Sequence, residues 1–261
     1  MPVDLVNDPL ISVRNVSKVY ESSGARFVAL EDVSFDIMDR EFTVIIGPSG
    51  CGKSTLLGIM GGLIAPTSGE VYVEGRKVEK PLPRLISVMF QNASVFPWRT
   101  VRKNVAFPLE VAGSPAAGRR EVETREIKRV GLSSFEGKFP EQLSGGMVQR
   151  VALARALAQG TRIILMDEPF GALDEQTRLS LSLELTRLWQ ETRNTIVFVT
   201  HSLQEAAFLA DQIIVISRRP GKIKRIVNVD VRRPRDLTGE DVNRTRALLW
   251  EMIAPEALSM I

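Results

Sequence analysis

Residues 47–55 read GPSGCGKST and fit the pattern GxxxxGK(S/T) at every fixed position. The apolar and β-branched run 42–46 precedes them as a buried strand would, and residues 54–63 have the apolar spacing of a helix. A glycine-rich turn between a strand and a helix can curl so that several backbone N–H groups point inward at a phosphate. We therefore interpret residues 47–55 as a phosphate-binding loop, in preference to a glycine-rich turn that matches by chance.

The residues of this loop have separate roles in this interpretation. Glycines let the backbone curl, Lys53 adds a full positive charge to the partial charge of the helix N-terminus, and the Ser54 hydroxyl would face Mg²⁺. Cys51 has no part in the chemistry, but we expect a bulky adduct on its thiol to project among the loop amides. The residues expected to bind the nucleotide are Gly47, Pro48, Ser49, Gly50, Cys51, Gly52, Lys53, Ser54 and Thr55.

Composition is that of an ordinary globular protein. The chain has 261 residues, of which 44% are hydrophobic and 25% charged, so it can bury one large domain or a domain with an inserted subdomain. No stretch approaches the ~18 to 20 uncharged apolar residues that span a bilayer, and residues 1–8 lack the features of a secretory signal. The single cysteine excludes an intrachain disulfide and is typical of a reducing compartment. We therefore expect a cytosolic location.

The charge distribution bears on the class of partner. The net charge is +3, and the basic residues are dispersed among nearly as many acidic ones. Short pairs of arginines at 218–219 and 232–233 are expected to be solvated surface rather than a binding patch. The sequence therefore predicts no nucleic-acid partner.

The spacing of apolar residues predicts alternating strands and helices. Apolar and polar residues alternate through 11–37, and a Ser-Ser-Gly turn at 22–24 divides them, which predicts an antiparallel hairpin. Prolines and charges break residues 92–158 into helical pieces, which indicates a helical insertion. Amphipathic segments of helix length separate the later strands, and this alternation implies a parallel sheet. Short strands are expected at 42–46, 69–73, 86–90, 162–166, 195–200 and 212–217.

A pair of carboxylates narrows the choice among the kinases, GTPases, helicases and transport ATPases that share a phosphate loop. The apolar strand 163–166 runs directly into Asp167 and Glu168. Asp167 can help to hold Mg²⁺, directly or through water, and Glu168 is placed to polarise an attacking water molecule. The chain therefore carries the groups that hydrolysis of a nucleotide requires.

A second phosphate-binding surface is predicted at residues 143–147. They read LSGGM and open a helix that we expect to run to about Ala158. The hydroxyl of Ser144 and the amides of Gly145 and Gly146 would lie at the positive end of this helix. One chain does not need two such surfaces for one nucleotide, unless the second serves a nucleotide held by a partner copy.

These motifs, in this order, resemble those of ATP-binding-cassette (ABC) ATPases, the nucleotide-binding subunits of membrane transporters. The resemblance covers nearly the whole chain and implies that residues 47–55 are the Walker A loop, 143–147 the signature and 172–174 the D-loop. It also implies that Tyr20 stacks on adenine, although simple strand packing is an alternative for this aromatic. Met147 stands where the signature usually has Gln, a departure that leaves its phosphate-facing residues unchanged.

The resemblance implies that ATP and Mg²⁺ are the ligands and that the protein is a Mg²⁺-dependent ATPase. Glu168 would be the catalytic base, while Gln91 and His201 would contact or sense the γ-phosphate. His201 is the only histidine and could be structural, but its place directly after a core strand favours the catalytic role. The catalytic residues are expected to be Glu168, His201, Gln91 and Lys53. The magnesium ligands are expected to be Ser54, Gln91 and Asp167.

The expected fold is α/β. It comprises a P-loop NTPase core with a mixed or parallel sheet, an N-terminal antiparallel β subdomain, and an α-helical subdomain inserted at about residues 92–158. The ATPase domain would span residues 9–235, and residues 236–261 would form a C-terminal helical tail.

The resemblance also implies partners. Two cassettes would form a homodimer in which Ser144, Gly145 and Gly146 of one copy close the nucleotide site of the other. The opening and closing of this dimer would drive integral-membrane permease subunits. The protein would therefore be peripheral, on the cytoplasmic face of the inner membrane. Residues 91–105 place Phe96 and Trp98 beside Gln91, where a permease helix would insert. The alternative for these two aromatics is burial in the core.

The substrate class is implied by the same segment. The Pro97-Trp98 pair resembles the corresponding segment of bacterial importers for nitrate, sulfonates, taurine and related small molecules. This resemblance also implies a separate substrate-binding protein, which importers of that branch use. The alternatives are the ATPase of an exporter and an ABC protein without a transport role. A regulatory cassette that only binds nucleotide would be expected to lack Glu168 or His201, and both residues are present.

Overall fold

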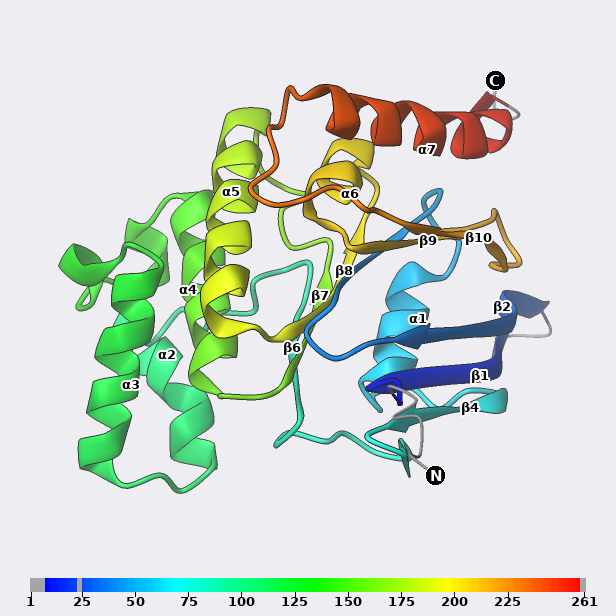
Figure 1. Ribbon diagram of the computed structural model, residues 1–261. Helices are drawn as coiled ribbons and strands as arrows, with labels where there is room; N and C mark the ends of the chain where they lie inside the picture. The colour runs from blue at the N-terminus through cyan, green and yellow to red at the C-terminus, as the bar shows by residue number, and fades with distance from the viewer. Residues whose placement is uncertain (1–7, 23–24, 259–261) are drawn as a thin grey trace, which may run out of the picture. The chain divides into compact units, whose positions relative to one another are not determined.

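The computed structural model describes residues 8–22 and 25–258. The chain forms two compact units, one that joins residues 1–82 to 195–261 and one that consists of residues 83–194 (Figure 1). Within the described residues, no helix combines the length and apolar composition that a membrane span requires.

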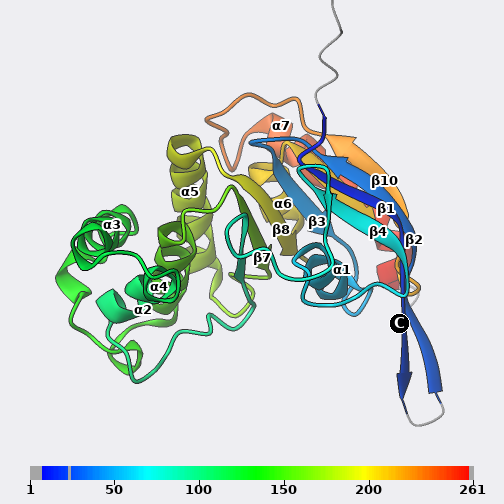
Figure 2. The ribbon, with the colours of Figure 1, turned by 90° about the horizontal axis from the view of Figure 1, so that it is seen from below.

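The first unit contains an antiparallel sheet (Figure 2). The predicted hairpin is confirmed, because its two strands pair in antiparallel register with Ile11 opposite Ile37 and Tyr20 opposite Phe27. Residues 23–24 of the predicted turn lie outside the described residues. In spatial order, the strands are β2 (Ala25–Ile37), β1 (Ile11–Ser22), β4 (Ser68–Val73) and β5 (Arg76–Lys77).

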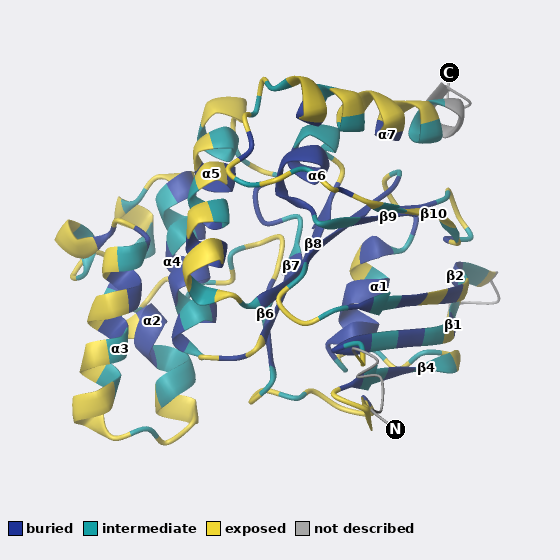
Figure 3. Ribbon diagram, in the orientation of Figure 1, coloured by how far each residue is buried: buried dark blue, intermediate teal, exposed yellow. Residues whose placement is uncertain are grey.

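A second, mixed sheet of the first unit positions the phosphate loop. β3 (Phe42–Ile46) pairs in parallel with both β8 (Thr195–Thr200) and β9 (Gln212–Ile216), as the alternation of strands and helices predicted. Every residue of β3 and β8 is buried, as Figure 3 shows for β8, which is typical of a sheet that is covered on both faces. The helices of this unit are α1 (Lys53–Met60), α6 (Leu203–Leu209) and α7 (Glu240–Leu258).

Two details of this unit differ from the prediction. The strand β10 (Ile223–Asn228), which pairs antiparallel to β9, was not predicted, because Lys224 and Arg225 interrupt its apolar residues and it is largely unburied. Helix α1 ends at Met60 rather than Leu63, because Gly62 adopts a φ of 69°, in the left-handed region that ends a helix.

The second unit is mainly helical. Helices α2, α3 and α4 pack on one another, in agreement with the helical pieces predicted for this region. Its two strands, β6 and β7, pair in parallel. The elements are β6 (Ile86–Met89), α2 (Val101–Val111), α3 (Ala116–Arg129), η1 (Ser133–Phe135), η2 (Pro140–Gln142), α4 (Gly145–Ala158), β7 (Ile163–Asp167) and α5 (Glu175–Thr192).

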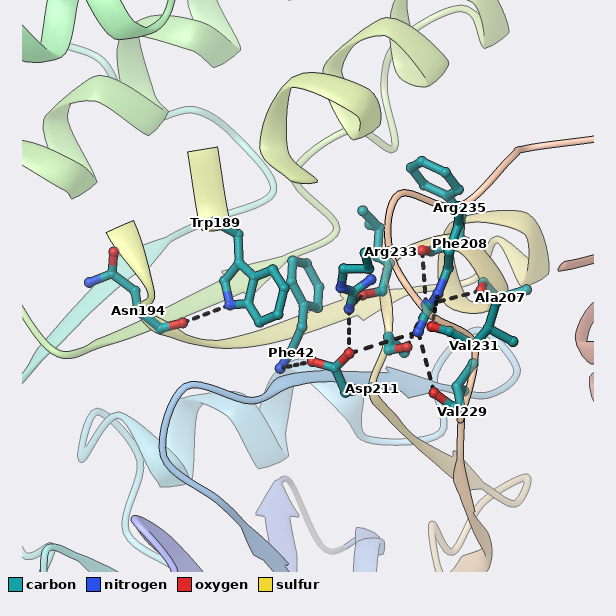
Figure 4. A network of polar contacts seen from close by, with 12 residues as sticks. Phe42, Trp189, Asn194, Ala207, Phe208, Asp211, Val229, Val231, Arg233 and Arg235 are labelled. Carbon is teal, nitrogen blue, oxygen red and sulfur yellow. Dashed lines mark hydrogen bonds and ion pairs between the residues drawn. The ribbon is translucent and has the colours of Figure 1, made fainter. Parts of the chain in front are cut away.

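A pair of arginines anchors the segment between β10 and α7 in the first unit (Figure 4). The side chain of Arg235 is 1% exposed, and burial lowers the pKa of this guanidinium to about 10. Arg233 donates to the Leu209 carbonyl and to Asp211, both at 2.6 Å. The acceptors of Arg235 are the carbonyl oxygens of Ala207, Phe208, Ala210, Val229 and Val231. The arginines therefore satisfy carbonyls that the C-terminus of α6 would otherwise leave without partners.

Candidate functional site

The phosphate loop connects β3 to α1, as its sequence predicted. Gly50 and Gly52 have φ values of 73° and 103°, in the left-handed region where a side chain is strained. Gly47 has an ordinary φ but no room, since a Cβ atom there would lie 2.6 Å from the Ile216 carbonyl oxygen. Three glycines are thus required for two different reasons, and together they fix the path of the loop.

Lys53, the first residue of α1, is held over the inside of the loop. Its side chain is buried, and its Nζ donates to the carbonyl oxygens of Gly47 at 2.9 Å and Pro48 at 3.0 Å. These bonds satisfy the buried ammonium group. Ser49, Gly50 and Ser54 are exposed, so the mouth of the loop is open to a ligand next to a positive charge.

The thiol of Cys51 does not lie where the sequence suggested. Cys51 is 1% exposed, and its sulfur packs behind the loop, 2.9 Å from the position that a Cβ atom on Gly47 would take. An adduct on this sulfur would therefore not project among the amides from the open side. The buried position of the thiol contradicts the expectation that an adduct on it projects among the loop amides, while the backbone of Cys51 remains part of the loop.

Tyr20 lies close to the helix that follows the loop. Its ring is half-buried and stacks on Phe27, with centroids 5.9 Å apart and planes inclined by 16°. Its hydroxyl lies 3.4 Å from the hydroxyl of Thr55, in the first turn of α1. Tyr20 therefore packs on Phe27 and also reaches the first turn of α1, while its stacking on adenine stays a prediction.

His201 occupies the same edge of the sheet as the phosphate loop. In the parallel register, Ile46 is opposite Thr200, so the residues that follow these two strands emerge side by side. The His201 side chain is exposed. The turn that carries it is fixed, because Ser202 caps α6 and the Thr200 hydroxyl accepts from the Ser202 amide at 3.0 Å. A buried carboxylate, Glu205, bonds to the same hydroxyl.

The two predicted carboxylates lie at one end of the parallel strand pair in the second unit. Asp167 is the last residue of β7, and Glu168 follows it with a φ of 41°. A left-handed backbone costs roughly 1 to 2 kcal/mol in a residue with a side chain, and such residues concentrate at functional sites. The Glu168 carbonyl accepts from the Gly171 amide at 3.1 Å, which holds this conformation.

Gln91 lies at the same end of that pair. Met89 of β6 is opposite Met166 of β7, so the chain beyond β6 and the chain beyond β7 leave the sheet together. Gln91 is exposed there, two residues past the end of its strand. The second unit thus brings Gln91, Asp167 and Glu168 to one edge.

The signature residues form the N-terminus of α4. Ser144 is the N-cap, and its hydroxyl accepts from the Met147 amide at 3.4 Å. Ser144 and Gly145 are exposed, whereas Gly146 is buried. A Cβ atom on Gly146 would lie 2.7 Å from the Thr177 methyl carbon, so this glycine is also required for packing against α5.

The D-loop leads into a second capped helix. Asp174 is the N-cap of α5 and accepts from the Thr177 amide at 2.9 Å. Hydrogen bonds from Thr177 lower the pKa of the Asp174 carboxyl, so it is a stable anionic cap. Leu173 lies in contact range of Gly145, which places the D-loop beside the signature.

An apolar groove of about 830 Å³ lies in the second unit, next to the segment where the sequence predicted that a permease helix would insert. Phe96 lines it and packs on Phe107 at 4.6 Å and on Trp98 at 5.5 Å between ring centroids. Arg155 holds the segment in place by donating to two carbonyl oxygens, those of Ala93 and Ser94. The core alternative is wrong for Trp98, whose exposed fraction is 71%. Phe96 is half-buried.

The donors predicted for Mg²⁺ have suitable chemistry. A hydroxyl, a carboxylate and an amide oxygen are hard oxygen ligands of the kind that Mg²⁺ prefers, usually beside phosphate oxygens and water. Among the described residues, no three His, Cys, Asp or Glu side chains cluster as a complete protein cage would require. Ser54, Gln91 and Asp167 each carry such an oxygen donor, and their joint binding of Mg²⁺ stays a prediction.

Comparison with known proteins gives a consistent set of similarities. The family model described as ABC transporter matches residues 30–171. An uncharacterized ABC transporter ATP-binding protein of Methanocaldococcus jannaschii is 46% identical over 251 residues, which cover 96% of this chain and 94% of that protein.

Two further relatives have names that state a substrate. The nitrate import ATP-binding protein NrtD of Synechococcus elongatus is 40% identical over 234 residues, 88% of this chain and 85% of that protein. The taurine import ATP-binding protein TauB of Roseobacter denitrificans is 43% identical over 216 residues, 82% of this chain and 80% of that protein.

A solved structure is similar across most of the chain. It is a dimeric, post-hydrolysis state of an ATP-binding cassette bound to ADP and Pi. The TM-score is 0.75 at 35% sequence identity, and the match covers 85% of this chain and all of that one (100%).

Proposed function

We propose that this chain, which belongs to the ABC transporter family of transport-coupled ATPases, is the nucleotide-binding subunit that energises an importer of small molecules. The observation that carries the proposal is the phosphate loop, in which three glycines fix the backbone and Lys53 is held at an open mouth. The exposed His201 leaves the sheet beside this loop, as a sensor of the terminal phosphate would.

The proposed chemistry is hydrolysis of ATP. The loop amides and Lys53 bind the β- and γ-phosphates, and Tyr20 stacks on the adenine. Glu168 accepts a hydrogen bond from the attacking water and orients it, while His201 and Gln91 respond to the γ-phosphate. Mg²⁺, when bound by Ser54, Gln91 and Asp167, would neutralise charge on the β- and γ-phosphate oxygens.

Two copies are proposed to pair head to tail around two nucleotides. Ser144 and Gly145 are exposed at the positive end of α4, where a phosphate could approach from another molecule. The similar solved cassette is a dimer, which supports this arrangement. ATP would then hold the two copies together, and hydrolysis would release them.

A permease is the proposed recipient of this motion. The groove lined by Phe96, with Trp98 exposed beside it, is an apolar surface suited to a helix from an integral-membrane subunit. The subunit would therefore be peripheral, on the cytoplasmic face of the inner membrane. A separate substrate-binding protein is proposed as the remaining component.

The proposed substrate is a small molecule of the nitrate, sulfonate or taurine class. The relatives named as nitrate and taurine import proteins support this choice. The residues that select the substrate would lie in other polypeptides, so an exporter or a non-transport ABC protein is the competing function.

Purification of the complex from its native membrane tests these alternatives. Co-purification of a permease and a substrate-binding protein, with ATP hydrolysis that depends on Mg²⁺ and rises with nitrate or taurine, is the expected result. A partner with no membrane span would contradict the transport role. A permease without a binding protein, whose vesicles expel rather than accumulate substrate, would favour the exporter.

A further inference from the structure

The turn between β9 and β10 lies directly against the phosphate loop. Its Gly221 amide donates to the Ala29 carbonyl at 3.0 Å, and its carbonyl accepts from the Glu31 amide at 3.0 Å. A Cβ atom on Gly221 would lie 2.1 Å from the Cys51 carbonyl oxygen, a distance at which no side chain fits. The turn is therefore fixed between β2 and the loop by contacts of the backbone itself.

Arg219 extends from this turn to the outer side of the loop. Its Nη2 donates to the Gly50 carbonyl oxygen at 3.0 Å, and its Nε donates to the same oxygen at 3.3 Å. The guanidinium carbon lies 3.9 Å from the centroid of the Phe27 ring. Because Phe27 in turn stacks on Tyr20, the arginine is held between the loop and the aromatic pair.

This contact holds one peptide group of the loop from its outer side. The peptide bond is planar and trans, so the Gly50 carbonyl and the Cys51 N–H point to opposite sides. With the carbonyl held outside by Arg219, the Cys51 N–H is directed inward, where it donates to the Pro48 carbonyl at 3.3 Å. Lys53 donates to the same Pro48 carbonyl oxygen, so this amide shares its surroundings with the loop cation.

Two partners act on this peptide group: Arg219 holds its carbonyl from outside the loop, and the Pro48 carbonyl accepts from its N–H on the inside. Gly50 has no side chain and a φ of 73°, so its own backbone restricts the peptide less than another residue would. A rotation of this peptide would turn a carbonyl dipole toward the phosphates, which repels them, and would remove an N–H donor. An orientation imposed from outside the loop therefore matters for an anion that the loop binds through its amides.

We propose that Arg219 is a positioning residue for nucleotide binding, which holds the Gly50–Cys51 peptide so that its N–H faces the phosphates. The inference rests on the proposed function of the loop as an ATP site. It predicts that Arg219 contributes to the binding of phosphates in the ground state and in the transition state alike. Loss of Arg219 therefore raises the KM for ATP and leaves kcat nearly unchanged.

Three variants of the full chain test the proposal. Arg219→Ala removes both hydrogen bonds, Arg219→Lys retains a positive donor without the paired geometry, and Arg218→Ala removes the same charge one residue away. The dissociation constant for ADP is measured by calorimetry, with KM and kcat for ATP and the melting temperature of the same preparations. Wild-type protein that binds no ADP would overturn the proposed function itself rather than the role of Arg219.

The expected result is a five- to tenfold rise in the ADP dissociation constant and in KM for Arg219→Ala, since a hydrogen bond from a charged donor on an exposed site has about this effect. Arg219→Lys should recover part of the loss, and Arg218→Ala should remain within about twofold of wild type. Unchanged ADP affinity in Arg219→Ala would overturn the proposal. An equal loss in Arg218→Ala, or a joint fall in kcat and melting temperature, would do so as well.

Discussion

The phosphate loop and the signature are both predicted to bind phosphate, but they are built differently. The loop has a buried cation, and glycines whose replacement would strain the backbone or collide with a neighbouring strand. The signature has an exposed serine and an exposed glycine at the end of a capped helix. The comparison supports the proposal that the loop binds a nucleotide within one chain, whereas the signature presents its donors to another molecule.

The largest effect should come from Glu168, the proposed catalytic carboxylate, which belongs to neither phosphate surface. Glu168→Gln removes the proposed base and should lower turnover by about 10² to 10⁴ while ATP binding remains. An ATP hydrolysis assay and gel filtration with ATP measure the two properties, and a stable ATP-dependent dimer is expected. Glu175→Gln, an exposed change in the first turn of α5, is the matched control. Wild-type turnover in Glu168→Gln would remove this residue from the role.

The signature is tested by a change that should act only across the dimer. Ser144→Arg fills the exposed end of α4 and should lower hydrolysis by roughly 10² to 10³, the effect of losing donors to a transition-state charge. The Ser144→Arg chain should still bind ATP at its own phosphate loop with unchanged affinity, as measured by calorimetry. Mixing with Lys53→Ala chains should restore one intact site per heterodimer, and a mixture no more active than its components would break the comparison.

The loop is tested by removing its cation. Lys53→Ala should weaken binding of ATP by about 10- to 100-fold, since a charged hydrogen-bond donor contributes about 1.5 to 3 kcal/mol. Calorimetry on the single chain suffices, because the effect does not require a partner. If binding weakened only in the dimer, the loop and the signature would not differ in the way their structures suggest.

A smaller effect is expected at the groove. Trp98 is largely exposed, so Trp98→Ala should change the free energy of unfolding by less than about 0.5 kcal/mol. The same change should make the free energy of docking to the permease less favourable by about 1 to 2 kcal/mol. Less permease should therefore co-purify with the variant. Leu183→Ala, another exposed apolar residue of the second unit, is the control. A destabilised chain that still assembles normally would contradict a docking role for Trp98.

Local patterns predicted much of this molecule. The β1–β2 hairpin followed from alternation, the start of α4 from a serine before two glycines, and the loop from glycines between a strand and a helix. Each of these signals lies within a few adjacent residues. Such patterns predict the conformation of the residues that carry them. They succeeded where that conformation depends mainly on adjacent residues.

Other features depend on contacts between distant residues and left no local pattern. Arg219 reaches Gly50 across 169 positions of sequence, and Arg155 reaches Ala93 across 62. The thiol of Cys51 is buried in the folded loop, which its own sequence context does not reveal. β10 was missed because an exposed edge strand can carry charged residues where a central strand cannot.

The position of Arg235 has a practical consequence for shortening the protein. The predicted end of the ATPase domain, residue 235, falls on a guanidinium that holds the last carbonyls of α6, and α6 begins immediately after the turn that presents His201. A protein cut before this residue would lose the clamp and fray the helix behind His201. One cut a few residues later would keep the clamp but would still remove α7, which packs on α6. The useful limit of a minimal cassette is therefore set by one side chain, a few residues beyond the last strand.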